Sequence, residues 1–168
     1  MTGKSDKEKR FLDITACYKE VLAKVCWLYV SPGASFDDLY QEVLINIWQG
    51  MDSFRGEAKI STWLYRTAIN TCISWHRHND RHSAGAVMRL EDMASDPADG
   101  QPSAAMIENY RELYSLISRL GPLDKAIITL WLDEKSYDEM AAIMGMTPGN
   151  VAVRLHRIKE KLSKMAAS

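Results

Sequence analysis

The sequence has 168 residues, of which 46% are hydrophobic and 26% are charged, with a net charge of −1. This composition is ordinary for a folded globular protein and excludes a collagen-like, low-complexity or uniformly basic chain. Its apolar runs are far shorter than the roughly 20 residues that a membrane-spanning helix requires, and the charged N-terminus is unlike a signal peptide. We therefore expect a cytoplasmic protein without membrane insertion.

The helices expected in the first half follow from periodicity and capping residues. Nearly every segment has helical periodicity, so the predicted fold class is all-α. The first helix is expected over 5–29. Ser35 is placed to cap a second helix that ends at Gly50, and Ser61 to cap a third that fades near Asp80.

A change of composition then divides the chain. The stretch EDMASDPADGQPSA is acidic and interrupted by proline and glycine, which is typical of a flexible linker. We predict two small helical domains, 1–90 and 105–168, joined by a flexible acidic linker at 91–104. Beyond the linker, helices are expected over 103–120 and 122–132.

The C-terminal end has the form of a helix-turn-helix. Ser136 and Glu139 form an S-x-x-E capping box before a short helix that ends at Gly145. Thr147 caps and Pro148 opens a long basic helix, expected to run to about Lys164. Winding that helix at 100° per residue places one apolar stripe toward the core, consisting of Val151, Leu155, Ile158 and Leu162.

The other faces of this last helix carry side chains suited to DNA. The N-terminal half of the second helix of such a motif enters the major groove. Arg157, His156 and Val153 are candidates for contacts to base edges. Candidates on the flanking faces, where lysine and arginine suit phosphates, are Asn150, Arg154, Lys159 and Lys161. The alternative is an amphipathic helix with a solvated basic face.

The helix expected from Ser61 has two different faces. One stripe reads as core and consists of Ile60, Leu64, Ala68, Cys72 and Trp75. The other combines a tryptophan with cationic and amide side chains, namely Trp63, Arg66, Asn70, Ser74 and Arg77. An exposed face of this kind suits single-stranded nucleic acid, because rings stack on unpaired bases. The alternative is a half-buried Trp63 beside solvated arginines.

The preceding helix also has a core stripe and a second face. The core stripe consists of Phe36, Leu39, Tyr40, Val43 and Ile47. Acids, amides and large apolar side chains form the second face, which carries Asp38, Gln41, Glu42, Ile45, Trp48 and Gln49. This mixture is typical of a protein-docking surface. A Trp48 that packs under the neighbouring loop is the alternative.

Charge supports this division of labour. Residues 53–90 contain six Lys or Arg against two acids, and residues 150–168 contain five against one. Residues 31–52 and 91–110 contain four and five acids, respectively, and no Lys or Arg. Two basic blocks on either side of an acidic segment indicate two places for a polyanion.

Enzymatic and metal chemistry are not predicted. The sequence has no phosphate-cradling glycine loop and no nucleophile–base motif, so no catalytic residue is assigned. Its three cysteines form no C-x-x-C pair. Cys72 with His76 and His78 is one ligand short of a closed zinc site. We expect neither a metal nor another cofactor.

In two places the sequence resembles bacterial sigma factors of the extracytoplasmic-function (ECF) group. The first contains the pieces D-L-x-Q-E-V-x-x-x-x-W at Asp38–Trp48, F-R-G at Phe54–Gly56, and T-W-L-Y-R-x-A-x-N-T from Thr62. These pieces resemble the domain that binds core polymerase and melts the promoter. The second, LISRLGPLDKAIITLWLDEKSYDEMAAIMGMTPGNVAVRLHRIKEKL, resembles the domain that reads the −35 element.

The resemblance implies partners and roles. The clamp helices of the largest polymerase subunit would bind the second face of the 36–50 helix, through Asp38, Gln41, Glu42, Ile45 and Trp48. Unpaired DNA of the −10 element would be held by Phe54, Arg55, Lys59, Trp63, Arg66, Asn70 and Arg77. The polymerase flap and an anti-sigma factor are further implied partners. The protein would join the nucleoid with polymerase, or be held at the membrane by an anti-sigma factor.

Two other classes of function remain open from the sequence. One is a helix-turn-helix regulator that acts without polymerase, and the other is a sigma-like decoy that binds core polymerase but not DNA. Because a sigma factor depends on polymerase for part of its binding free energy, we expect the isolated chain to bind promoters weakly.

Overall fold

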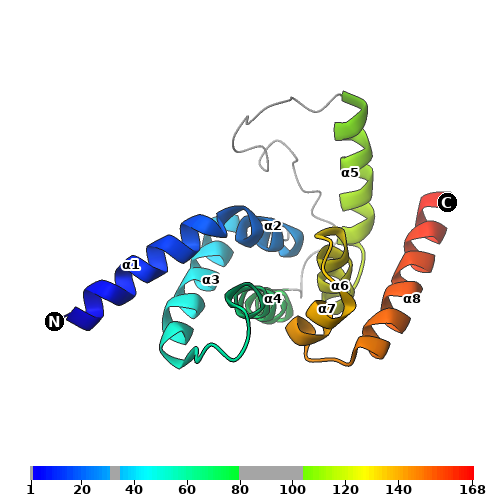
Figure 1. Ribbon diagram of the computed structural model, residues 1–168. Helices are drawn as coiled ribbons and strands as arrows, with labels where there is room; N and C mark the ends of the chain where they lie inside the picture. Colours follow the sequence, from blue (N-terminus) through cyan, green and yellow to red (C-terminus); the bar gives the residue numbers. More distant parts are fainter. Residues whose placement is uncertain (1, 31–34, 80–103) are drawn as a thin grey trace.

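The computed structural model describes residues 2–30, 35–79 and 104–168, and over these ranges its secondary structure is helical (Figure 1). The all-α prediction is confirmed. The helices are α1 (Thr2–Cys17), α2 (Lys19–Tyr29), α3 (Phe36–Gly50), the 3₁₀ turn η1 (Met51–Ser53), α4 (Ile60–Asn79), α5 (Ala104–Ser118), α6 (Pro122–Leu132), α7 (Tyr137–Met144) and α8 (Pro148–Ala167). The predicted linker lies outside the described residues, except for Ala104, with which α5 begins.

Two predictions about the first half are wrong. The single helix expected over 5–29 is divided at Tyr18, whose ψ of 15° interrupts the helical path between α1 and α2. Ser61 does not cap α4, because the helix already begins at Ile60. The Ser35 cap is confirmed, since its side chain accepts a hydrogen bond from the backbone N–H of Asp38.

The caps of the second half are confirmed. Ser136 accepts from the backbone N–H of Glu139, and the Glu139 carboxylate accepts from the backbone N–H of Ser136, which completes the capping box. Gly145 ends α7 at a φ of 66°, a left-handed conformation that glycine adopts without strain. Helix α8 begins as predicted at Pro148 after the Thr147 cap and runs to Ala167, three residues past the predicted end.

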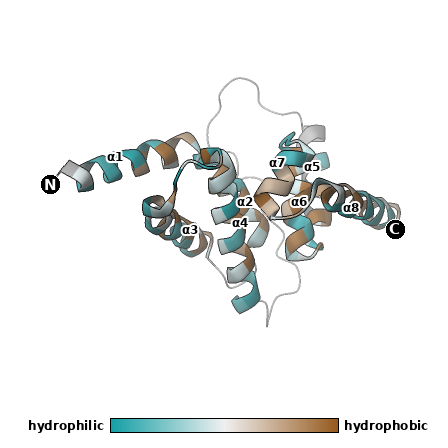
Figure 2. Ribbon diagram, turned by 60° about the horizontal axis from the view of Figure 1, so that its bottom comes forward, coloured by the Kyte–Doolittle hydropathy of each residue, from teal (hydrophilic) through white to brown (hydrophobic). Residues whose placement is uncertain are grey.

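The hydrophobic core is continuous through both halves of the chain. In the first half it is formed by α2, α3 and α4, with Leu22, Val43 and Leu64 among its buried side chains. In the second half, Ile127 of α6 and Leu155 of α8 are buried in the same cluster. Figure 2 shows much of α6 in the brown of hydrophobic residues, amid the other helices of this half. The predicted α8 stripe is confirmed, with Leu162 at its half-buried end.

The two halves pack directly on each other, an arrangement that the sequence did not predict. Helix α4 contacts α6 and α7, and α2 contacts α5 and α6 (Figure 1). Tyr29 is buried at this junction and donates a 2.6 Å hydrogen bond to the carbonyl oxygen of Pro122. The helix with the predicted single-strand-binding residues therefore lies against the helix-turn-helix.

Candidate nucleic-acid and polymerase interfaces

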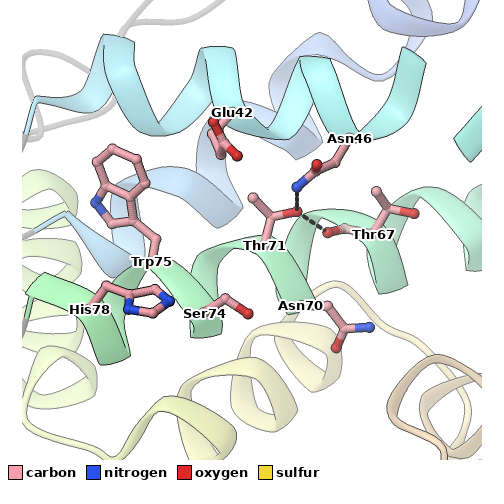
Figure 3. A pocket seen from close by; sticks show the side chains of 8 residues that line it. All are labelled: Glu42, Asn46, Thr67, Asn70, Thr71, Ser74, Trp75 and His78. Carbon is pink, nitrogen blue, oxygen red and sulfur yellow. Dashed lines mark hydrogen bonds between the residues drawn. The ribbon is translucent and has the colours of Figure 1, made fainter. Parts of the chain in front are cut away.

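A polar cavity of about 480 Å³ lies between α3 and α4 (Figure 3). Glu42 and Asn46 extend into it from α3, and the remaining lining side chains come from α4. Asn46 donates a 2.9 Å hydrogen bond to the Thr71 hydroxyl, which donates a 2.7 Å bond to the Thr67 carbonyl oxygen. These two bonds fix one wall of the cavity.

The other groups of the cavity are suited to a flat polar ligand. Asn70, Ser74 and His78 line it with exposed side chains, and an amide can donate and accept hydrogen bonds at once. Trp75 rises from α4 toward α3, and its Nε1 is the one buried side-chain nitrogen or oxygen within the described residues that lacks a hydrogen-bond partner. The cavity thus combines an aromatic wall with hydrogen-bonding groups, as an unpaired base requires.

Sequence reasoning had assigned only part of this cavity. Asn70 belonged to the predicted −10 set, and Glu42 to the predicted polymerase face. Asn46, Thr67 and Thr71 had no assigned role, although a polar stripe at helical spacing on α4, from Thr67 through Thr71 to His78, was a signal for them. The predicted core assignment of Trp75 agrees with its packing against the hydrophobic cluster.

Trp63 is not on an open face, contrary to the sequence prediction. Its indole is half-buried, tilted against the Phe54 ring at a centroid distance of 5.3 Å. Trp63 also packs on Gly50, where an added Cβ would lie 2.9 Å from the indole Cζ2. Trp63 therefore secures the loop between α3 and α4 to α4, and Phe54 is held in the same contact.

The predicted cations of the −10 site fall into two groups. Arg55 and Arg77 are exposed. Arg66 instead donates hydrogen bonds from Nε to the Ile143 carbonyl oxygen, at 3.4 Å, and from Nη2 to that of Ala142. Lys59 lies 4.0 Å from the Glu139 carboxylate. Arg66 and Lys59 thus face α7, so the structure does not gather all the predicted residues on one open surface.

The predicted polymerase face on α3 is exposed except at its C-terminal end. Asp38, Gln41, Glu42 and Ile45 are exposed, with Ile45 at 48%. Trp48 is half-buried instead. Its ring meets Phe11 of α1 edge-on at 5.3 Å, and the Lys7 ammonium lies 4.3 Å from the ring centroid. Trp48 anchors α1, which corrects its assignment to an open docking face.

The predicted −35 residues on α8 are also divided. Asn150, Val153, His156, Arg157 and Lys161 are exposed. Arg154 donates a 2.7 Å hydrogen bond from Nε to Asp124, and the Lys159 ammonium lies 3.8 Å from the Trp131 ring centroid. These last two residues pack against α6, while the exposed set covers the face that a DNA groove would meet.

Two local features bear on the predicted absence of metal chemistry. Within the described ranges, no group of three His, Cys, Asp or Glu is arranged to hold a metal ion. A hydrogen bond with Cys26, together with burial, raises the pKa of Cys72 well above its usual value. In the same described ranges, no helix has the length and apolar character needed to cross a bilayer.

The two halves match two known regions of one class of transcription factor. Residues 14–82 match the family model of Sigma-70 region 2, and residues 110–162 match that of Sigma-70, region 4. Together with the helical fold, these matches define a sigma factor of RNA polymerase.

Full-length relatives define the family more narrowly. The chain is 30% identical to the ECF RNA polymerase sigma-E factor of Escherichia coli (strain K12) over 164 residues, which cover 92% of this chain and 85% of that protein. It is 28% identical to the ECF RNA polymerase sigma factor SigW of Bacillus subtilis over 170 residues, which cover 96% and 91%. The chain belongs to the ECF family of RNA polymerase sigma factors, which direct the polymerase to promoters and are not enzymes.

Two solved structures share the fold across both halves. CnrH in complex with the cytosolic domain of CnrY has a TM-score of 0.66 and covers 95% of this chain and 89% of that one. The sigma factor RpoE in complex with the anti-sigma factor NepR, from Bartonella quintana, has a TM-score of 0.70 and covers 95% and 98%. Each is 21% identical to this chain.

Proposed function

We propose that this sigma factor binds the polymerase clamp helices through α3, captures an unpaired base of the −10 element in the α3–α4 cavity, and reads the −35 element with α8. The observation that carries this proposal is the cavity itself. It places the exposed amide of Asn70 beside the Trp75 indole, directly next to the acidic face of α3. One helical hairpin would then bind polymerase and DNA together.

The energetics require polymerase. Extruding a base costs a few kcal/mol, and stacking on an aromatic side chain contributes roughly 1–3 kcal/mol. A single base pocket therefore offsets little more than the cost of extrusion. The contact between α3 and polymerase would supply the remaining binding free energy, without nucleotide hydrolysis.

Domain boundaries and further partners are part of the proposal. We keep 1–90 and 105–168 as the two DNA-binding units, joined by 91–104, and the cytoplasm as their location. The solved complex of RpoE with the anti-sigma factor NepR supports an anti-sigma factor as a regulator of this chain.

The test is transcription in vitro from a library of randomised promoters with purified core polymerase. Promoters recovered with the wild-type chain should share two elements, one near −35 and one near −10. Asn70→Ala should lower transcription from those promoters by about tenfold, since one polar base contact is worth roughly 1–3 kcal/mol. The matched control is Asn109→Ala, which alters an exposed amide on α5, away from the cavity. Equal transcription by both variants would contradict base capture at Asn70.

A further inference from the structure

The two halves are joined at Asp133, the residue that follows α6. Its Oδ2 accepts a 2.9 Å hydrogen bond from the Tyr65 hydroxyl of α4, and its Oδ1 pairs with the Lys24 ammonium of α2. The Asp133 side chain is only 14% exposed and Tyr65 only 4%. One carboxylate thus binds two helices of the other half in a site that water reaches poorly, where charged hydrogen bonds are stronger than at an open surface.

This junction also engages cations that the proposed function assigns to DNA. Arg66, next to Tyr65, donates to the carbonyls of Ala142 and Ile143 near the C-terminus of α7. Those carbonyls carry the negative end of the helix dipole, which favours a guanidinium. Lys59 faces Glu139 of the same helix. In this arrangement α7 occupies positions that DNA phosphates would take.

The closed arrangement is also incompatible with a promoter. Elements near −35 and −10 are about 25 base pairs apart, which is roughly 80 Å of duplex. In the structure α4 packs directly on α7, the first helix of the helix-turn-helix. The two DNA-binding halves must therefore separate before both elements can be bound. Arg157 and His156 of α8, in contrast, are exposed in the closed arrangement.

We infer that the junction at Asp133 is an autoinhibitory clasp, which keeps Arg66 and Lys59 from single-stranded DNA until polymerase separates the two halves. The inference rests on the proposed role of Arg66 in binding DNA. A binding-competent state that is only a minor fraction of the free protein lowers the apparent affinity by that fraction. Weak DNA binding by the free chain then has a structural cause in this contact.

The test uses the full chain with Asp133→Asn and Tyr65→Phe combined, which removes the carboxylate charge and the phenol hydroxyl. Small-angle X-ray scattering measures the radius of gyration, and fluorescence anisotropy measures binding to a mixed-sequence single-stranded DNA of about 20 nucleotides, longer than a typical binding site. Glu134→Gln is the matched control, because it removes the same charge from the exposed neighbouring residue. Circular dichroism verifies helix content, and Lys24→Met replaces the double variant if the latter does not fold.

We expect the double variant to have a larger radius of gyration and to bind the DNA about five- to tenfold more tightly, as for the release of a minor open state. Glu134→Gln should change neither quantity, and adding Arg66→Ala to the double variant should remove the gain. Expansion without tighter binding overturns autoinhibition, and neither change overturns Asp133 as the clasp. Failure of the proposed function is seen separately, as the absence of promoter-specific transcription by wild-type chain and core polymerase.

Discussion

Arg154 and Asp124 form an ion pair, with 2.7 Å between Nε and Oδ1, that ties the middle of α8 to the first turn of α6. The Arg154 side chain is 40% exposed and that of Asp124 is 23% exposed. Arg157 lies three residues further along α8 and is exposed. Two arginines that the sequence assigned to one DNA-binding surface thus have different surroundings.

Replacement of each arginine by alanine should separate these roles. Arg154→Ala is expected to lower the free energy of unfolding by about 1 kcal/mol, because solvent screens the pair in part. Arg157→Ala should change stability by less than about 0.5 kcal/mol but lower −35-dependent transcription about tenfold. Denaturant unfolding and transcription in vitro measure the two effects, and binding of core polymerase should be intact in both variants. Full transcription by Arg157→Ala would show that Arg157 does not contact bases.

The α3 face can be tested at its exposed isoleucine. Ile45→Glu should weaken binding to core polymerase by about tenfold or more, because it places a charge at the apolar centre of the proposed interface. Leu12→Glu on α1 is the matched control, since Leu12 is 64% exposed and Ile45 48%. Titration of labelled chain with core polymerase gives both affinities. Equal losses in the two variants would remove the basis for placing the interface on α3.

A methyl group at Gly50 should disturb the loop between α3 and α4. Gly50 has helical dihedral angles, so alanine would suit its backbone, yet its Cβ would lie 2.9 Å from Trp63 Cζ2. We expect Gly50→Ala to lower the free energy of unfolding by about 1–3 kcal/mol, as overpacking does. Trp63 fluorescence should shift as well. Gly121→Ala is the control, because its added Cβ would meet no atom within 4 Å. A more stable Gly50→Ala chain would mean that Trp63 moves aside at no cost.

The capping box predicts a pH dependence. The hydrogen bond from the Ser136 backbone N–H lowers the pKa of Glu139 below its usual 4.5. A carboxylate with a depressed folded-state pKa contributes stability above its unfolded pKa and loses it as the pH falls through the folded value. Glu139→Gln should therefore be less stable than wild type at pH 7, and the difference should shrink below about pH 4.5. Urea unfolding across this range measures it, and a pH-independent difference would exclude the ionised cap.

Thiol chemistry tests the packing of α2 against α4. Cys17 is exposed, whereas Cys26 and Cys72 are buried, and the pKa of Cys72 is raised. Because thiolate is the reactive form, a maleimide should label Cys17 rapidly and the other two only after unfolding. Mass spectrometry counts the labels, and Cys17→Ser should abolish the rapid step. Rapid labelling of Cys72 in the native chain would contradict the packing of this core.

The sequence by itself determined the helical fold, the caps at Ser35, Ser136 and Thr147, and the apolar stripes of α3 and α8. These features depend on residues within about four positions of one another, so periodicity and capping rules reach them. The match to a sigma factor also follows from short motifs in order. What a helix face shows to a neighbour within one turn is a local property.

Only the tertiary structure decided which of the polar and aromatic faces remain open. Trp48 is covered by α1, Arg154 is held by Asp124, and Tyr65 and Arg66 contact residues that lie at least 68 positions away along the chain. Helical winding assigns a side chain to a face, but the partner of that face depends on how separate helices pack. The closure of the two halves at Asp133 is such a long-range contact, and it determines which DNA-binding side chains the free protein presents.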